Sequence, residues 1–74
     1  MLVDLMINFN TFLILVDDTY DTYSFQWRYG QTIMNVLHGA NPFLYNQIVS
    51  TDNDCYYDDG IVKLTLQKLE QEWT

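Results

Sequence analysis

Three stretches of the chain alternate apolar and polar residues in the manner of β-strands. The first begins with alternation and runs into the apolar segment FLILV, the second alternates from end to end, and the third alternates valine and leucine with polar residues. A period of two among β-branched and aromatic residues is typical of half-buried strands. We therefore predict strands at Ile7–Asp17, Thr22–Tyr29 and Ile61–Lys68.

The segment DDTYD, between the first two predicted strands, is predicted to be a loop, because aspartate and threonine side chains satisfy nearby backbone groups. It contains no glycine, so we expect a loop longer than a tight two-residue turn. The next strand would place four aromatic residues on one face, namely Tyr23, Phe25, Trp27 and Tyr29. We expect that face to pack on a helix. Stacking on single-stranded bases would need a basic groove, and only Arg28 accompanies these rings.

The middle of the chain carries helical signals. Apolar residues at helical spacing predict a helix over Gln31–His38, with Gly39 as its stop. The pair Asn41-Pro42 predicts the start of a second short helix, since asparagine caps helices and proline is tolerated in their first turn. The break between the two leaves both a kinked helix and a helical hairpin open for residues 31–49.

The remaining segments have weaker signals. We predict an acidic loop over Ser50–Gly60, a lead-in or short helical turn at Met1–Met6, and a helical tail over Glu70–Thr74. Trp73 is expected to be a clasp over the sheet or an interface anchor. The third predicted strand could instead be helical. Four apolar residues in this strand and the segment that follows it stand near helical spacing: Val62, Leu66, Leu69 and Trp73.

These elements predict a single domain over residues 1–74 with an α+β fold. Its order is ββαβ, a three-stranded antiparallel sheet with one or two short helices packed on one face. The second face and at least one sheet edge would stay uncovered, and an open edge invites pairing with another chain. Since 49% of the 74 residues are hydrophobic, we expect part of this surface to be buried in a homodimer or against a protein partner.

The net charge and the single cysteine limit the partners and the cellular compartment that we expect for the protein. The net charge of −7 argues against binding nucleic acid or an anionic membrane, and favours a basic partner surface or simple solubility. One cysteine allows no internal disulfide, which fits a reducing compartment. The apolar start, residues 1–16, is shorter than the roughly 18 to 20 residues of a spanning helix. We therefore predict a cytoplasmic protein, in the host cytoplasm if it is viral.

The sequence offers little for catalysis or metal binding. His38 and Cys55 could form a base and nucleophile pair, but no third residue that would orient them is evident. A calcium loop starting at Asp52 would need glycine at its sixth position and glutamate at its twelfth, where this chain has Tyr57 and Lys63. We predict that the protein is not an enzyme and uses no metal or cofactor.

The aspartates suggest a different activity. They gather in two predicted loops, at positions 17, 18 and 21 and at positions 52, 54, 58 and 59. Carboxylates spaced along a rigid scaffold can imitate the phosphates of DNA, which present about one charge per 1.7 Å of duplex axis. Such a mimic would bind a basic groove, and it would also need an exposed apolar wedge, because surface ion pairs contribute little.

Four motifs resemble the small uracil-DNA glycosylase inhibitors of Bacillus phages: FLILVDD, YSFQWRYG, NVLHG and VKLTLQKL. The resemblance covers about half of the chain, and residues 41–54 form an insertion that the family lacks. It implies a dimer that mimics DNA with acidic side chains and fills the enzyme's base pocket from a helix. The family uses a phenylalanine there, and Met34 stands at that position in this chain.

We therefore predict an acidic inhibitor of phage type that covers the DNA-binding groove of a host protein, such as a uracil-DNA glycosylase, a nuclease, a CRISPR effector or a restriction enzyme. The charge contacts are predicted at Asp17, Asp18, Asp21, Asp58 and Asp59. Met34 and Leu37 are predicted to form the apolar wedge. The alternative is a non-catalytic dimerising module whose charge serves only solubility.

Overall fold

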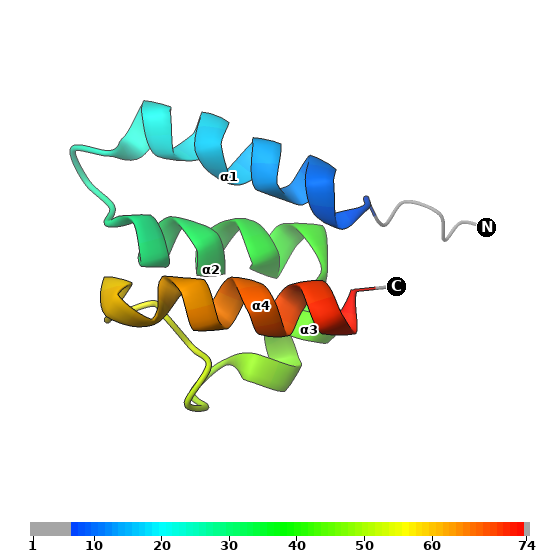
Figure 1. Cartoon of the computed structure of the whole chain (residues 1–74). Helices are drawn as coiled ribbons and strands as arrows, with labels where there is room; N and C mark the ends of the chain where they lie inside the picture. The colour runs from blue at the N-terminus through cyan, green and yellow to red at the C-terminus, as the bar shows by residue number, and fades with distance from the viewer. Residues whose placement is uncertain (1–6, 74) are drawn as a thin grey trace.

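The computed structural model describes residues 7–73, and over that range it is built from helices joined by turns (Figure 1). Its elements are α1 (Phe9–Tyr23), α2 (Tyr29–Ala40), α3 (Pro42–Ile48), the 3-10 turn η2 (Asp59–Ile61) and α4 (Val62–Glu72). Residues 7–73 contain no strand, so the predicted α+β fold with a three-stranded antiparallel sheet is wrong. The predicted lead-in at Met1–Met6 lies outside the described residues.

The first predicted strand, Ile7–Asp17, belongs almost entirely to α1. Asn8 caps this helix, because its side-chain oxygen accepts a 2.8 Å hydrogen bond from the backbone N–H of Thr11. The predicted DDTYD loop is the continuation of the same helix. The buried or half-buried residues of α1 follow the helical period rather than alternation: Phe9, Phe12, Leu13, Val16, Thr19 and Tyr20.

The second predicted strand, Thr22–Tyr29, spans the end of α1, a turn and the first residue of α2. The backbone turns back on itself here, since the N–H of Trp27 donates to the carbonyl of Tyr23 at 2.8 Å. The two rings stack with centroids 4.6 Å apart, while Phe25 is 79% exposed. The four aromatic residues therefore do not line one face of a sheet.

The third predicted strand, Ile61–Lys68, lies in η2 and α4. The helical alternative is the correct one, because Thr65 and Leu69 are both fully buried and stand one helical turn apart. The predicted tail is helical over Glu70–Glu72 and leaves the helix at Trp73, and Thr74 lies outside the described residues. Leu64, which alternation would place with the core, is instead 54% exposed.

The two predicted helices in the middle of the chain are confirmed as α2 and α3. Asn41 separates them and is 2% exposed. Its N–H donates to Leu37 at the end of α2, and its side-chain oxygen accepts from the N–H of Leu44 in α3. One asparagine thus ends one helix and caps the next, so residues 31–49 form two helices.

Helix α2 is the centre of the molecule. In Figure 1, α1 lies along one side of α2, α4 lies in front of it and the short α3 lies below. Each helix contributes apolar side chains to one core, whose members are Phe12, Val16, Ile33, Met34, Leu37, Leu44, Ile48, Cys55 and Leu69. No helix within residues 7–73 is both long enough and apolar enough to cross a membrane.

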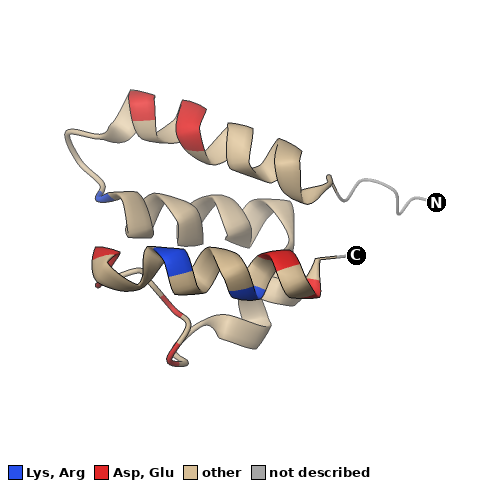
Figure 2. Cartoon of the chain, in the orientation of Figure 1, with Lys and Arg blue, Asp and Glu red and all other residues tan. Residues whose placement is uncertain are grey.

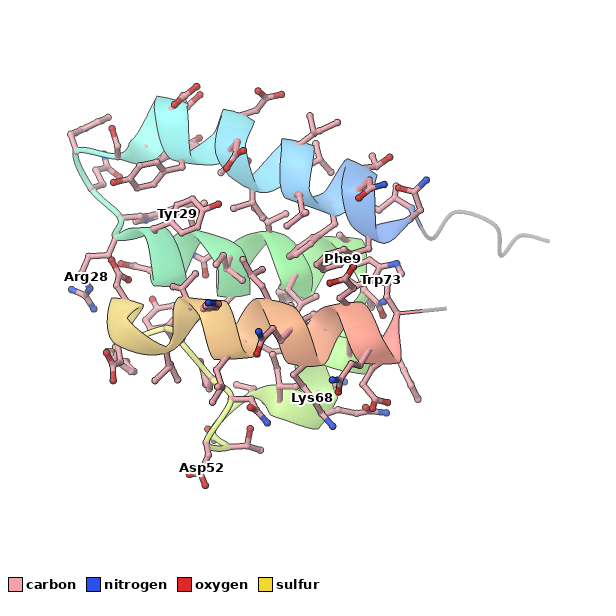
Figure 3. All side chains as sticks on the ribbon, in the orientation of Figure 1. Phe9, Arg28, Tyr29, Asp52, Lys68 and Trp73 are labelled. Atoms are coloured by element: carbon pink, nitrogen blue, oxygen red, sulfur yellow. The ribbon has the colours of Figure 1, made fainter. Side chains whose placement is uncertain are left out.

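Two contacts fasten the distant parts of the chain to this core. Near one end, the carboxylate of Asp59 accepts a 2.8 Å hydrogen bond from the N–H of Gly30 in the first turn of α2. At the other end, the indole N–H of Trp73 donates to the carbonyl of Ile7 at 2.8 Å, and its ring packs 5.7 Å from that of Phe9 (Figure 3). Trp73 is therefore a clasp, over α1 rather than over a sheet.

Candidate functional site

The most acidic helix is α1, whose last two turns carry Asp17, Asp18 and Asp21 with all three side chains exposed (Figure 2). The helix contains no lysine or arginine. At a rise of about 1.5 Å per residue, the three carboxylates leave the helix within about 6 Å along its axis. The helix thus gathers the three aspartates that the sequence analysis placed in a loop.

This arrangement opposes the electrostatics of the helix itself. The C-terminal end of a helix carries a partial negative charge and favours cations, and the last turn of α1 holds Asp21 and no basic residue. Asp21 also stands four residues from Asp17 and three from Asp18, spacings at which like charges repel by about 0.2–0.5 kcal/mol per pair. The aspartates therefore lower the stability of α1.

Asp17 has one fixed contact within the chain. Its carboxylate accepts a 2.9 Å hydrogen bond from the hydroxyl of Tyr29, which is the first residue of α2. Burial, the hydrogen bond to Asp17 and the negative charge of Asp17 together raise the pKa of Tyr29 to about 12. The Tyr29 ring also packs edge-on against Tyr20, with centroids 5.1 Å apart, so Asp17 is held at the junction of α1 and α2.

Apolar side chains lie exposed beside these carboxylates. Ile14 is 61% exposed, Leu15 is 40% exposed and Phe25, in the turn after α1, is 79% exposed. We call the surface formed by these three residues and the three aspartates the α1 face. The sequence analysis missed its apolar members because it buried FLILV in a strand. The signal that could have found them is the helical spacing of Ile14, Asp18 and Asp21.

The other two aspartates predicted to contact a partner lie away from the α1 face. Asp58 accepts a 2.8 Å hydrogen bond from the N–H of Gly60 and so caps η2, and Asp59 holds Gly30 as described above. Both lie in the segment that leads into α4, and Asp59 contacts the start of α2, whereas the other three aspartates lie on α1. The five predicted charge contacts are thus split into a group of three on α1 and a structural pair.

Met34 and Leu37 do not form an exposed apolar wedge. Met34 is 1% exposed and Leu37 is 0% exposed, because both point from α2 into the core. The sequence analysis placed them on the surface because it packed a sheet against only one side of this helix. With α1, α3 and α4 around α2, these positions lie inside the molecule.

The two residues considered for catalysis have separate surroundings. The Cys55 thiol is fully buried and donates to the carbonyl of Gly30 at 3.4 Å, and burial raises its pKa. The exposed His38 ring packs edge-on against Tyr45, with centroids 4.8 Å apart. Over residues 7–73, no group of three or more histidine, cysteine, aspartate or glutamate side chains is arranged to hold a metal ion.

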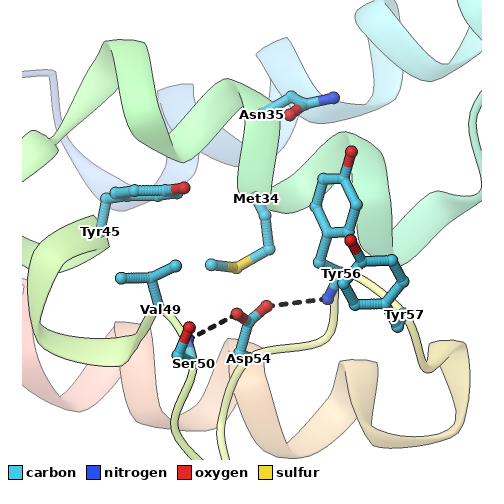
Figure 4. A pocket seen from close by; sticks show the side chains of 8 residues that line it. All are labelled: Met34, Asn35, Tyr45, Val49, Ser50, Asp54, Tyr56 and Tyr57. Carbon is cyan, nitrogen blue, oxygen red and sulfur yellow. Dashed lines mark hydrogen bonds between the residues drawn. The ribbon is translucent and has the colours of Figure 1, made fainter.

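Two hollows mark the surface. An apolar groove of about 400 Å³ runs between α1 and α4, with Phe9 and Leu13 on one side and Val62 and Leu66 on the other. A second hollow of about 380 Å³ lies between α2, α3 and the acidic loop (Figure 4). It has a different lining, with three tyrosines and a carboxylate: Met34, Asn35, Tyr45, Val49, Ser50, Asp54, Tyr56 and Tyr57.

Comparison of the chain with protein-family models, with curated proteins and with solved structures finds no match. Two of the four motifs that carry the resemblance to the phage inhibitors, FLILVDD and VKLTLQKL, are helical in this chain and do not form the strands predicted for them. The function is therefore inferred from the residues of this chain and their placement.

Proposed function

We propose that this protein is a non-catalytic inhibitor that uses the α1 face to cover the basic groove of a DNA-processing or defence protein. The observation that carries the proposal is the placement of Asp17, Asp18 and Asp21 on one exposed helical surface with three exposed apolar side chains around them. The carboxylates supply attraction to a basic groove, and the apolar side chains supply the contact area that surface ion pairs alone lack.

The charge density of the α1 face supports DNA mimicry. The first and last of the three carboxylates stand about 6 Å apart along the helix axis, an average spacing of about 3 Å per charge, which is of the same order as the one charge per about 1.7 Å of duplex DNA. A groove lined with lysine and arginine would therefore meet a comparable negative field at the last two turns of α1. Association would be fast at low salt and would weaken as ionic strength rises.

The electrostatic conflict within α1 also favours binding over solubility alone. Carboxylates that serve only solubility can lie anywhere on the surface, whereas Asp21 lies in the last turn of α1, where the helix disfavours a negative charge, and within repelling distance of Asp17 and Asp18. A local arrangement that lowers stability is expected at functional sites. Basic side chains of a partner would neutralise the repulsion among the three aspartates.

The test compares two triple variants that remove the same charge from different places. In the first, Asp17, Asp18 and Asp21 are replaced by asparagine, which can still accept the hydrogen bond from Tyr29. In the control, three other exposed acids become amides: Asp52→Asn, Glu70→Gln and Glu72→Gln. Each immobilised variant is exposed to a nuclease-treated host lysate, and bound proteins are eluted with salt or with duplex DNA.

The wild-type protein and the control should retain the same basic DNA-binding protein, and both salt and duplex DNA should release it. The α1 variant should retain none, although its free energy of unfolding should rise by up to about 1 kcal/mol as the repulsion is removed. Equal capture by the two triple variants, or a captured protein that duplex DNA does not displace, would contradict mimicry at this face.

The groove between α1 and α4 favours a second candidate function, a dimerising module. Its walls are mostly apolar, with Lys63, Gln67 and Glu70 among the residues that line it, and exposed apolar surface of this kind marks protein contacts. In this case sedimentation should show a dimer that persists at high salt, and Leu13→Ser in the groove wall should convert it to a monomer. A concentration-independent monomer at all salt concentrations would exclude this function.

A further inference from the structure

The tyrosine-lined hollow is an open depression lined by three different segments of the chain. The side chain of Met34, on α2, forms the floor of the hollow. Figure 4 shows Tyr45 on one side of Met34 with Tyr56 and Tyr57 on the other. The rings of Tyr56 and Tyr57 meet at 67° with centroids 4.7 Å apart, so they form two walls of a corner. The volume of about 380 Å³ is within the range of small-molecule sites.

A carboxylate faces this aromatic corner. The two oxygens of Asp54 accept hydrogen bonds from the backbone N–H groups of Ser50 at 2.7 Å and of Tyr56 at 2.9 Å. These bonds fix the position of the side chain, and each oxygen keeps a further lone pair. None of the lining residues is lysine or arginine, so the negative charge of Asp54 has no cationic partner within the lining.

The groups that face this hollow suit a particular kind of ligand. Aromatic rings attract cations through the negative charge of their faces, and quaternary ammonium groups are recognised in proteins by cages of such rings. A thioether such as that of Met34 packs readily against methyl groups. A carboxylate adds charge attraction without the strict geometry that a metal ion requires. The net charge of −7 favours the approach of any cation.

We propose that this hollow binds a trimethylammonium group, with the rings of Tyr45, Tyr56 and Tyr57 around its methyl groups and Asp54 as its counter-ion. The exposure of Tyr57 is consistent with this role, since Tyr57 is 83% exposed and a ligand in the corner would cover one side of its ring. The site is separate from the α1 face, so its binding does not depend on the function proposed above.

Titration by NMR tests the proposal with small probes. Choline represents a free metabolite, Nα-acetyl-trimethyllysine represents a modified protein side chain, and 3,3-dimethylbutan-1-ol is an uncharged molecule with the shape of choline. The N-methyl resonance of a bound ligand should shift upfield because it lies against aromatic rings. Binding of one charged probe and not the other would identify the source of the trimethylammonium group.

Two substitutions at Tyr57 separate the aromatic contribution from simple packing. Tyr57→Phe keeps the ring and should bind as the wild type does. Tyr57→Leu keeps an apolar side chain without a ring, and should raise the dissociation constant by roughly 2- to 30-fold. Because Tyr57 is exposed, both variants should keep the helical circular dichroism of the wild type. If Tyr57→Leu loses helicity, the same comparison is made with Tyr45→Phe and Tyr45→Leu.

Three results would overturn the proposal. They are the absence of binding by both charged probes, affinity for the neutral alcohol equal to that for choline, and affinity in a folded Tyr57→Leu variant equal to that in Tyr57→Phe. Selective binding of a charged probe, weakened by leucine and kept by phenylalanine, would establish the site.

Discussion

Two glycines in α2 should respond to the same substitution in opposite ways. A Cβ atom added at Gly30 would overlap the backbone carbonyl oxygen of Cys55 and would stand 2.8 Å from a carboxylate oxygen of Asp59. A Cβ atom added at Gly39 would meet no heavy atom within 4 Å. Neither glycine has a positive φ, so the backbone of both positions accepts alanine and only the space around them differs.

The expected magnitudes follow from these surroundings. Alanine favours a helix over glycine by up to about 1 kcal/mol, so Gly39→Ala should raise the free energy of unfolding by about 0.5–1 kcal/mol. At Gly30 the obstacle is backbone, and the loop that carries Cys55 and Asp59 must retreat. Overpacking of this kind costs about 1–3 kcal/mol, and the retreat also lengthens the 2.8 Å hydrogen bond from Gly30 to Asp59. We expect Gly30→Ala to lower the free energy of unfolding by about 1–2 kcal/mol.

Urea and thermal denaturation followed by circular dichroism would measure both changes. In a domain of this size 1 kcal/mol shifts the melting temperature by about 4–8 °C, so the two variants should melt roughly 6 °C or more apart. The double variant should show additive effects, because the two sites share no contact. If Gly30→Ala were as stable as the wild type, the acidic loop would not pack against the start of α2 as described.

Three further predictions concern buried groups. Thr65→Val should lower the free energy of unfolding by about 1–3 kcal/mol, because the carbonyl of Asn53 loses a 2.6 Å hydrogen bond in buried surroundings; unchanged urea denaturation would argue against that bond. The pKa of Tyr29 lies at about 12 instead of 10, so its neutral phenol stabilises the folded chain fully below pH 10 and loses this effect as the pH rises through 12. Denaturation across that interval should therefore show a smaller loss of stability in Tyr29→Phe than in the wild type, and identical profiles would refute the role of Tyr29. The Cys55 thiol is buried with a raised pKa, so iodoacetamide should modify it far more slowly in the folded protein than in urea, and equal rates would show that the acidic loop opens freely.

The sequence predicted those elements whose signals are local. The cap at Asn41 involves only nearby backbone groups, and α3 begins directly after it. The acidic segment Ser50–Gly60 is irregular as far as Asp58, as predicted, and only its last residues enter η2. In each case the physical cause lies within a few residues of the signal, which is why periodicity and capping rules sufficed. The stop predicted at Gly39 is wrong, because α2 continues through Gly39 to Ala40 and ends at Asn41.

Two of the predicted strands, Ile7–Asp17 and Ile61–Lys68, failed because their apolar residues fit a helical period as well as alternation, whereas Thr22–Tyr29 failed because it holds a turn between two helices. In FNTFLILVDD, a strand would bury Leu13 and Leu15 together, whereas a helix buries Phe12 with Val16 and leaves Leu15 partly exposed. The choice is made by Asn8, which caps the helix, and by the core surface of α2. The first of these signals was present in the sequence, but the second depends on contacts between distant residues.

The candidate site was predicted only in part, again because some of its contacts join residues that are distant along the chain. Asp17, Asp18 and Asp21 are exposed together, as a loop would also have placed them. Their apolar neighbours depend on which side of α1 meets α2, and the tyrosine-lined hollow depends on how α3 returns beneath α2. Neither arrangement can be read from residue spacing, because each joins segments that are distant along the chain.

The hydrogen bond between Trp73 and Ile7 determines where a tag can be attached without covering the α1 face. Both ends of the described chain emerge at the same pole, and α1 carries its aspartates toward the opposite one (Figure 1). A biotin tag, a fluorescent reporter or a bead attached near either end would therefore stand away from Asp21 and Phe25. Experiments that immobilise the protein through its ends should leave the α1 face free to meet a partner from solution.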